Sequence, residues 1–139
     1  MIILDTNVVS ALMRNVPEPA VVAWLDGQPA ESIWITTVTL FEALFGIATL
    51  PAGRRRKELQ ASFDNLIKED LESRILDLDG AAAIAAAQLA ATRHGRGRPV
   101  DSRDTFIAGI ALSRKATLAT RNVRDFSDLS VPIVDPWHA

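Results

Sequence analysis

The chain begins with a carboxylate in an apolar setting, where metal or acid–base chemistry is plausible. Asp5 directly follows the apolar run Met1–Leu4 and is the only charged side chain before Arg14. An apolar run that ends in polar residues is typical of a buried strand, and ligands of open α/β sheets bind at the carboxyl ends of the strands. Because a buried carboxylate without a partner is costly, we expect another group to compensate Asp5.

Two further carboxylates stand in comparable settings. Glu42 lies among apolar residues and is the only charged residue between Glu31 and Arg54. No basic residue lies within one helical turn of it along the chain, which favours a functional role over an ordinary exposed position. Asp104 opens a predicted helix, where an acidic residue could simply cap the helix, although Asp101 competes for that role.

A fourth polar group follows another predicted strand, Thr117–Thr120. Asn122 could be a turn residue, and Asp125 could be a solvated loop charge or a helix cap. Since both follow a strand end, they are also expected at the same edge of the sheet as Asp5. These interpretations remain open for each residue taken alone.

Taken together, Asp5, Glu42 and Asp104 indicate a site for a hard cation. Carboxylates about 4 Å apart repel each other by roughly 4 kcal/mol at an effective dielectric constant of about 20. Such a cluster must take up a proton or bind a cation. The chain has no Cys and only two His residues, so the oxygen ligands favour Mg²⁺ or Mn²⁺ over zinc. Mg²⁺ held by carboxylates suits phosphoryl chemistry.

Alternating strand and helix patterns must position these side chains. The strands are predicted at Ile2–Asp5, Ile33–Thr36, Arg74–Leu78, Thr117–Thr120 and Val131–Val134. Helices are predicted near Val8–Met13, Val38–Thr49, Arg54–Lys68, Ala81–His94 and Asp104–Lys115. The second of these has apolar residues all around its axis, as in a buried helix. Strands separated by helices predict an α/β fold with a parallel sheet and helices on both faces.

Composition limits the class of protein. The 139 residues are 48% hydrophobic and 23% charged, which predicts one globular domain over residues 1–139. No transmembrane helix or signal peptide fits the sequence, and the absence of Cys excludes disulfides, so we expect a cytoplasmic protein without a membrane partner. A net charge of −2 means that nucleic-acid binding would need a local basic surface.

The chain resembles PIN-domain ribonucleases, and among them the VapC-type toxins of type II toxin–antitoxin systems, in particular the FitB-like branch. The resemblance covers essentially the whole chain and rests on these segments: Leu4-Asp5-Thr6-Asn7, Glu42, Asp104 with Ile107-Ala108, Thr120-Arg121-Asn122 with Asp125-Phe126, Val21–Leu25, and Asp135–His138.

The resemblance implies a PIN-like three-layer sandwich around a central parallel sheet of four to five strands. It also implies a metal-dependent endoribonuclease that hydrolyses RNA phosphodiesters with water activated by Mg²⁺, with Mn²⁺ as the alternative metal. By position, Asp5, Glu42 and Asp104 would be catalytic metal ligands. The fourth acidic site falls on Asn122, with Asp125 as an alternative. The groups expected to hydrogen-bond the ligands are Thr6, Asn7 and Thr120.

The resemblance further implies a cognate antitoxin that wraps the toxin, and a homodimer that could join a larger complex. Docking points for a partner are expected at Val8, Leu12, Trp24 and Leu25. A basic stretch beside Asp104 could contact RNA phosphates, or it could be a solvated helix end or pair with a partner's acidic groups. Its residues are Arg93, His94, Arg96, Arg98 and Arg103, with Arg121 near the same edge.

Other functions fit less well. A receiver-like module would be expected to show paired acids after its first strand and a late Lys at a strand end, whereas Thr6 follows Asp5 and the fourth strand ends in Thr120-Arg121. A PIN-like fold that only binds RNA or protein stays open because of Asn122. Neither a nucleotide-binding glycine motif nor a plausible nucleophile–His pair is present.

Overall fold

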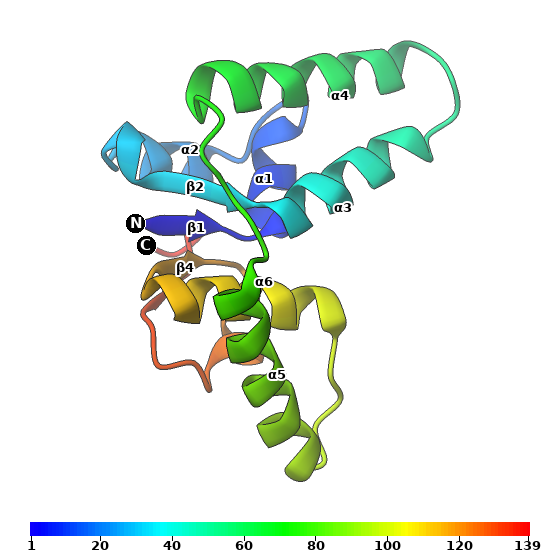
Figure 1. Cartoon of the computed structure of the whole chain (residues 1–139). Coiled ribbons are helices and arrows are strands. Elements are labelled where there is room, and N and C mark those ends of the chain that lie inside the picture. The colour runs from blue at the N-terminus through cyan, green and yellow to red at the C-terminus, as the bar shows by residue number, and fades with distance from the viewer.

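The computed structural model describes all 139 residues as a parallel five-stranded sheet with helices on both faces (Figure 1). The strand order is β3-β2-β1-β4-β5, so β1 is central. The strands are β1 (Ile2–Leu4), β2 (Ile33–Thr36), β3 (Ile75–Leu76), β4 (Thr117–Ala119) and β5 (Ile133–Val134). The long helices are α1 (Thr6–Met13), α2 (Pro19–Asp26), α3 (Thr37–Ala48), α4 (Arg54–Asn65), α5 (Gly80–Gly95) and α6 (Ser102–Arg114). Short helical segments are η1 (Ala30–Ser32), η2 (a π-helix at Leu66–Asp70) and η3 (Val123–Phe126). The predicted fold class is therefore confirmed.

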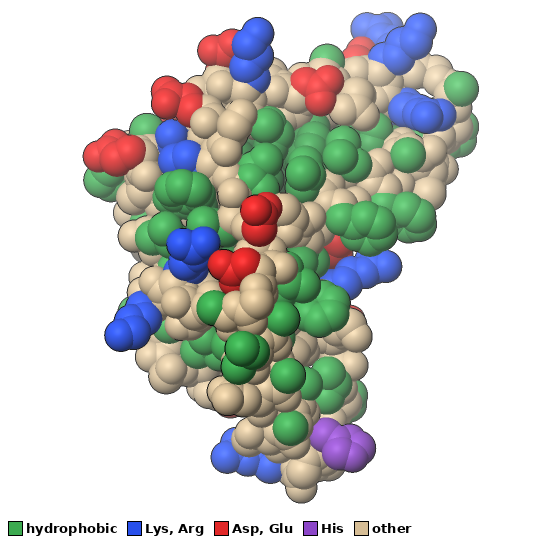
Figure 2. Space-filling view, viewed as in Figure 1, with side chains coloured by type: hydrophobic (Ala, Val, Ile, Leu, Met, Phe, Trp, Pro, Cys, Tyr) green, Lys and Arg blue, Asp and Glu red, His purple; other side chains and the backbone are tan.

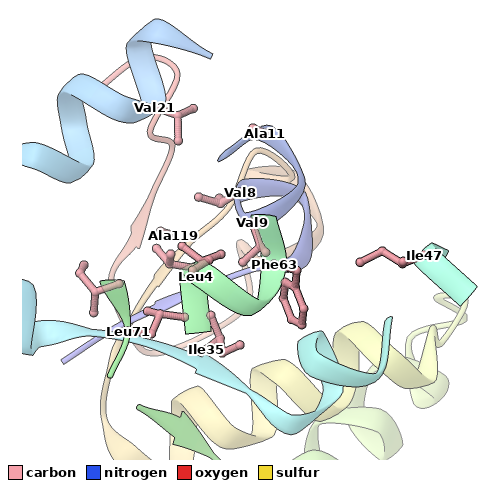
Figure 3. Packing of buried hydrophobic residues seen from close by; sticks show 12 residues of the cluster. Leu4, Val8, Val9, Ala11, Val21, Ile35, Ile47, Phe63, Leu71 and Ala119 are labelled. Carbon is pink, nitrogen blue, oxygen red and sulfur yellow. The ribbon is translucent and has the colours of Figure 1, made fainter. Parts of the chain in front are cut away.

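Each face of the sheet carries its own hydrophobic core. Successive side chains of a strand point to opposite faces, and in β1 Leu4 joins one core while Ile3 joins the other. The first core packs α1, α2 and α4 onto the sheet, with Val8, Val9 and Phe63 fully buried (Figure 3). The second core packs α5 and α6 onto the opposite face. These two cores give the three layers that the resemblance implied.

Helices α5 and α6 pack closely because small residues face each other. A Cβ on Gly109 would lie 2.5 Å from the carbonyl oxygen of Ala82 and 2.7 Å from the Cβ of Ala86. Only glycine fits this position, since real Cβ atoms do not approach other atoms so closely. The close approach at Gly109 therefore determines how α6, the helix that carries Asp104, packs against α5.

Two sequence-based expectations about helix burial are wrong. Helix α3 is not a buried helix, because its only buried residues are Thr39 and Ile47. Phe41 and Phe45 stack on each other with ring centroids 5.8 Å apart and are 55% and 52% exposed. Figure 2 shows hydrophobic side chains gathered along α3, which extends away from the sheet. Phe41, Leu44 and Phe45 therefore face solvent, where the sequence pattern suggested an enclosed helix.

The expected docking points also differ. Val8 is fully buried in the first core and cannot meet a partner. Leu12, Trp24 and Leu25 are partly buried and pack against the same core.

The bounds of one predicted helix also differ from the structure: α6 begins at Ser102, and Asp101 is its cap. None of the helices combines the length and the hydropathy that a membrane-spanning segment needs.

Candidate active site

Asp5 lies where the central strand β1 meets α1, and its carboxylate is held on both oxygens. The Asp5 N–H donates to the Ala119 carbonyl (2.9 Å), which fixes its backbone against β4. Its Oδ1 accepts the N–H of Thr6 (2.8 Å). Its Oδ2 accepts the Asn7 amide (3.1 Å) and the Thr120 hydroxyl (2.8 Å). The carboxylate is thereby oriented at the carboxyl edge of the sheet, with only 3% of the residue exposed.

Glu42 reaches the same edge from α3 through a chain of hydroxyl groups. The Thr6 hydroxyl donates to Glu42 Oε1 (2.9 Å) and lies 2.9 Å from the Thr39 hydroxyl, which must then donate to Thr6. Thr6 therefore holds Glu42 with its side chain and Asp5 only with its backbone. Glu42 is not without a basic partner, as the sequence suggested, since Arg103 Nη1 lies 3.6 Å from Oε2. This pairing comes from α6, and local spacing along α3 could not reveal it.

Asp104 lies in the first turn of α6 but does not cap it. The Asp101 carboxylate is the cap and accepts the Asp104 N–H at 3.0 Å. None of the ion pairs in the chain involves Asp104. Burial is the main cause that raises the pKa of Asp104 to about 6, and the charges of Asp5, Asp101, Glu42 and Asp125 add to it. Asp104 is thus half-buried among acidic groups and forms no ion pair.

The pKa of Asp5 is also raised, chiefly by burial. The hydrogen bonds from Thr120 and Thr6 lower it, while the charge of Glu42 raises it again. Asp5, Glu42 and Asp104 therefore influence each other electrostatically, as expected of one site. No group of three or more His, Cys, Asp or Glu side chains lies close enough to hold a metal ion together. The predicted ligands are neighbours at one edge of the sheet, but they do not form a closed coordination cage.

The two candidates for the fourth position differ in their surroundings. Asn122 follows β4, is exposed, and donates its backbone N–H to the Thr120 hydroxyl at 3.0 Å. Asp125 is exposed in η3, and its charge is one of the causes that raise the pKa of Asp104. Asp125 thus brings a negative charge toward this site, as Asp101 does more strongly, whereas Asn122 brings none.

The predicted basic rim divides into two groups. Arg103 lies beside Glu42 and over the Phe41 ring at 5.8 Å, and Arg121 stacks on the Trp137 ring at 4.9 Å. Arg96 and His94 are exposed at the end of α5. Arg93 and Arg98 do not belong to a free rim, because both bind Asp128 at 2.9 Å. Sequence patterns could not reveal this pairing, since Asp128 lies in a polar loop at least 30 residues away from both arginines along the chain.

A groove of about 510 Å³ opens beside the site between α1, α3 and α4. Thr6 and Glu42 line the end near the carboxylates, and Arg14 and Arg55 line it farther along. Its apolar lining includes Ile47 and Leu59. The groove gives an extended ligand a path to Glu42 that passes two basic side chains.

Comparison with known proteins identifies the family. The PIN domain family matches residues 2–131. The chain is 35% identical to the VapC ribonuclease Y4jK of Sinorhizobium fredii over 137 residues, which is 99% of this chain and 98% of that protein. It is 33% identical to the toxin FitB of Neisseria gonorrhoeae over 138 residues, or 99% of each chain.

A solved structure agrees with these relatives. The structure of FitAB bound to a DNA fragment superposes with a TM-score of 0.89 at 33% identity, covering 100% of this chain and 97% of that chain. The sheet order, the acidic edge and the full-length similarity lead to one conclusion. The chain belongs to the PIN-domain family, in the group that contains VapC ribonucleases and the FitB toxin.

Proposed function

We propose that this protein is a Mg²⁺-dependent endoribonuclease and the toxin of a type II toxin–antitoxin pair. The observation that carries the proposal is the acidic edge of the sheet, where Asp5 and Asp104 are crowded by other carboxylates and have no ion-pair partner. Relatives named as a ribonuclease and as a toxin, similar over the full chain, support both parts of it. The proposed domain extends over residues 1–139.

The residues fit a hard divalent cation. All the donors at this edge are carboxylate, hydroxyl or amide oxygens, which Mg²⁺ and Mn²⁺ prefer. Mg²⁺ usually keeps several waters and takes only one or two protein carboxylates, so it does not need the closed cage that is lacking here. Asp5 and Asp104 would be its direct ligands, with Glu42 as a further ligand and Asp125 or Asn122 in the fourth position. When bound, the cation would polarise water and neutralise phosphate charge.

The remaining chemistry would come from the side chains around the carboxylates. Asn7 and Thr120 keep Asp5 Oδ2 in one orientation, which spares the site reorganisation on binding. The Thr6 hydroxyl does the same for Glu42. Below pH about 6, Asp104 would hold a proton, so protons and the cation would compete for its carboxylate. Arg103 and Arg121 would contact RNA phosphates at the rim of the site.

The proposal can be tested with isosteric variants. Asp5→Asn and Asp104→Asn should abolish Mg²⁺-dependent cleavage of total RNA, measured by sequencing of the new 5′ ends, while circular dichroism shows an intact fold. Asp77→Asn is the matched control, because Asp77 is exposed and makes no ion pair. Cleavage by either site variant at the wild-type rate would mean that the site is wrong. Mn²⁺ should replace Mg²⁺, and EDTA should stop the reaction.

A protein partner and a dimer belong to the same proposal. The similar FitAB structure is a toxin–antitoxin complex, which supports a cognate antitoxin for this chain. Co-expression with the product of a neighbouring short gene should suppress RNA cleavage and yield a stable complex. The homodimer and the cytoplasmic location stay predictions, and light scattering of the purified chain would test the former.

A non-catalytic PIN-like module that binds RNA or protein is the second candidate. Asn122 favours it, since this position brings no charge. It predicts RNA binding without any cleavage at saturating Mg²⁺ or Mn²⁺, and the same sequencing experiment decides between the two.

A further inference from the structure

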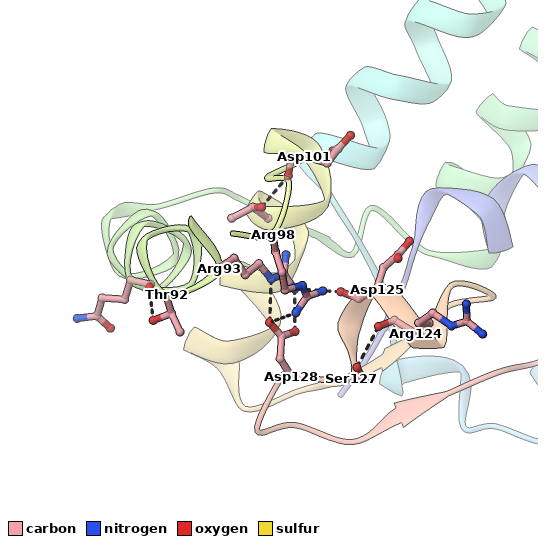
Figure 4. Close-up of polar contacts among 10 residues, drawn as sticks. Thr92, Arg93, Arg98, Asp101, Arg124, Asp125, Ser127 and Asp128 are labelled. Carbon is pink, nitrogen blue, oxygen red and sulfur yellow. Dashed lines mark hydrogen bonds and ion pairs between the residues drawn. The ribbon is translucent and has the colours of Figure 1, made fainter. Parts of the chain in front are cut away.

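A buried ion pair between Arg93 and Asp128 lies outside the set of residues that the proposed chemistry uses. Arg93, in the last turn of α5, is only 4% exposed. Its Nε and Nη2 donate to both carboxylate oxygens of Asp128 at 2.9 Å each, a bidentate arrangement. Arg98 adds a third hydrogen bond to Asp128 at 2.9 Å. Figure 4 shows the two guanidinium groups converging on this one carboxylate.

The same guanidinium also binds the backbone next to the site. Arg93 Nη2 donates to the Asp125 carbonyl oxygen at 3.0 Å. The Asp125 carboxylate points away from this contact (Figure 4), and its charge acts on Asp104. One buried side chain therefore binds this turn at two points, the backbone of Asp125 and the side chain of Asp128.

Few other polar contacts fasten this turn. Between Val123 and Asp128, the remaining side-chain and turn hydrogen bonds stay within the loop itself, as from Ser127 to Arg124. The hydrogen bonds that tie these residues to other elements all come from Arg93 and Arg98. The other attachment is apolar, through the fully buried Phe126. An apolar anchor sets position loosely, whereas a bidentate guanidinium sets orientation as well.

Stability alone is a weak explanation for this arrangement. Burial of an ion pair costs desolvation, and apolar residues of similar volume often stabilise a protein as well or better. The desolvation is compensated here, since both carboxylate oxygens of Asp128 are hydrogen-bonded and Asp125 accepts a further donor. What an apolar replacement could not supply is the fixed orientation of the Asp125 backbone.

We propose that Arg93, with Asp128 and Arg98, forms a positioning clamp for the turn that follows β4 and Asn122 at the acidic edge, and that this clamp keeps Asp125 available as a further carboxylate of the active site. This inference rests on the proposed function, because the position of Asp125 matters only if this edge binds the cation. It also assigns the fourth position to Asp125 in preference to Asn122. Arg93 acts through Asp125 and does not itself contact the substrate.

A double-mutant cycle tests the clamp. Arg93→Met and Asp125→Asn should each weaken Mn²⁺ binding, followed by electron paramagnetic resonance, and lower kcat on an RNA oligonucleotide by about 10-fold or more, as loss of groups that orient metal ligands does. The double variant should lose no more than Asp125→Asn alone, since both changes remove the same group. Arg93→Lys keeps the charge but cannot donate two parallel hydrogen bonds to Asp128, so it should recover only part of the Mn²⁺ affinity and kcat that Arg93→Met loses.

Controls separate positioning from stability. Asp79→Ala removes the cap of α5 at its other end, where Asp79 accepts the Ala82 N–H at 2.9 Å. It should lower the Tm but leave Mn²⁺ affinity and kcat unchanged. If Arg93→Met does not fold, the cycle is run with Asp128→Asn and with Arg98→Met, whose side chain is 37% exposed.

Three results would overturn the clamp: effects of Arg93→Met that resemble those of Asp79→Ala, additive losses in the double variant, or unchanged Mn²⁺ binding and kcat in Asp125→Asn. In each case Asp5→Asn would still abolish cleavage if the proposed function holds. A wild-type protein that cleaves no RNA would instead refute the proposed function, and the Mn²⁺ titrations would then decide on the clamp alone.

Discussion

Replacement of Asp104 by Asn should stabilise the metal-free protein at neutral pH while it removes activity. Burial and the charges of Asp5, Asp101, Glu42 and Asp125 raise the pKa of Asp104 from 3.8 to about 6. A group with a raised acidic pKa is protonated more readily in the folded state than in the unfolded chain. Above pH 3.8 Asp104 ionises in the unfolded chain while it still holds its proton in the folded protein. The free energy of unfolding therefore falls as the pH rises toward 6 and stays reduced at higher pH.

The size of this effect follows from the shift. About two pKa units at about 1.4 kcal/mol per unit give an upper bound near 3 kcal/mol. Because Asp104 is only half-buried, solvent screening should reduce the loss to about 1 kcal/mol. The Asn variant avoids this loss at all pH values. The difference in the free energy of unfolding should therefore be near zero at pH 4 and reach its full size above pH 6.

Urea denaturation in EDTA, at several pH values from 4 to 8, measures this difference directly. EDTA is essential because a bound cation would reverse the sign by stabilising the ionised carboxylate. Asp77→Asn, a change of the same kind at an exposed position, controls for the effect of the substitution itself. If Asp104→Asn is no more stable than the wild type at pH 8, or if the difference does not depend on pH, the crowding of carboxylates at this edge is refuted.

Three further outcomes follow from the structure. Gly109→Ala places a Cβ 2.5 Å from the Ala82 carbonyl oxygen, so it should lower the free energy of unfolding by about 1–3 kcal/mol. Thermal denaturation would measure this loss, and an unchanged Tm would mean that α5 and α6 can separate freely. Thr120→Val removes the hydroxyl that donates to Asp5 Oδ2 at 2.8 Å and should weaken Mn²⁺ affinity by about 10-fold, as followed by calorimetry. Wild-type affinity would show that Asn7 and the Thr6 N–H are enough to orient the carboxylate. Arg121→Gln should reduce the dependence of RNA affinity on salt by about one phosphate contact, measured by fluorescence anisotropy from low to high salt; an unchanged salt slope would place Arg121 off the RNA path.

The sequence predicts much of the fold because the fold depends on local patterns. Strand Ile33–Thr36 has the predicted bounds, and the predicted strand Thr117–Thr120 differs from β4 by one residue. Predicted Val131–Val134 is longer than β5, Ile133–Val134, since strand ends depend on hydrogen bonds that periodicity does not specify. Helix α3 is the main failure: its apolar face reflects exposed aromatic residues, and sequence periodicity cannot tell a covered surface from an open one.

The candidate site, like the fold, could be predicted from the sequence only in part. Asp5, Asn7 and Thr120 could be placed together because parallel strands end at one edge, and the structure joins them by hydrogen bonds. Contacts between distant side chains leave no such pattern. The pairing of Arg103 with Glu42 spans two helices, so the sequence could not show it.

The buried ion pair of Arg93 and Asp128 bears on how the acidic edge is held together. Carboxylates that raise each other's pKa also push each other apart, so a protein that keeps them together needs contacts that resist this repulsion. At Asp5 these contacts are the hydrogen bonds of Asn7 and Thr120. At Asp125, on an exposed turn, the corresponding contact is the Arg93 guanidinium, which binds the backbone and leaves the carboxylate free. A cation that restrained the Asp125 carboxylate directly would neutralise the charge that a metal site requires. Restraint through the backbone carbonyl keeps that charge available, which is why Arg93 suits the position and a rim arginine would not.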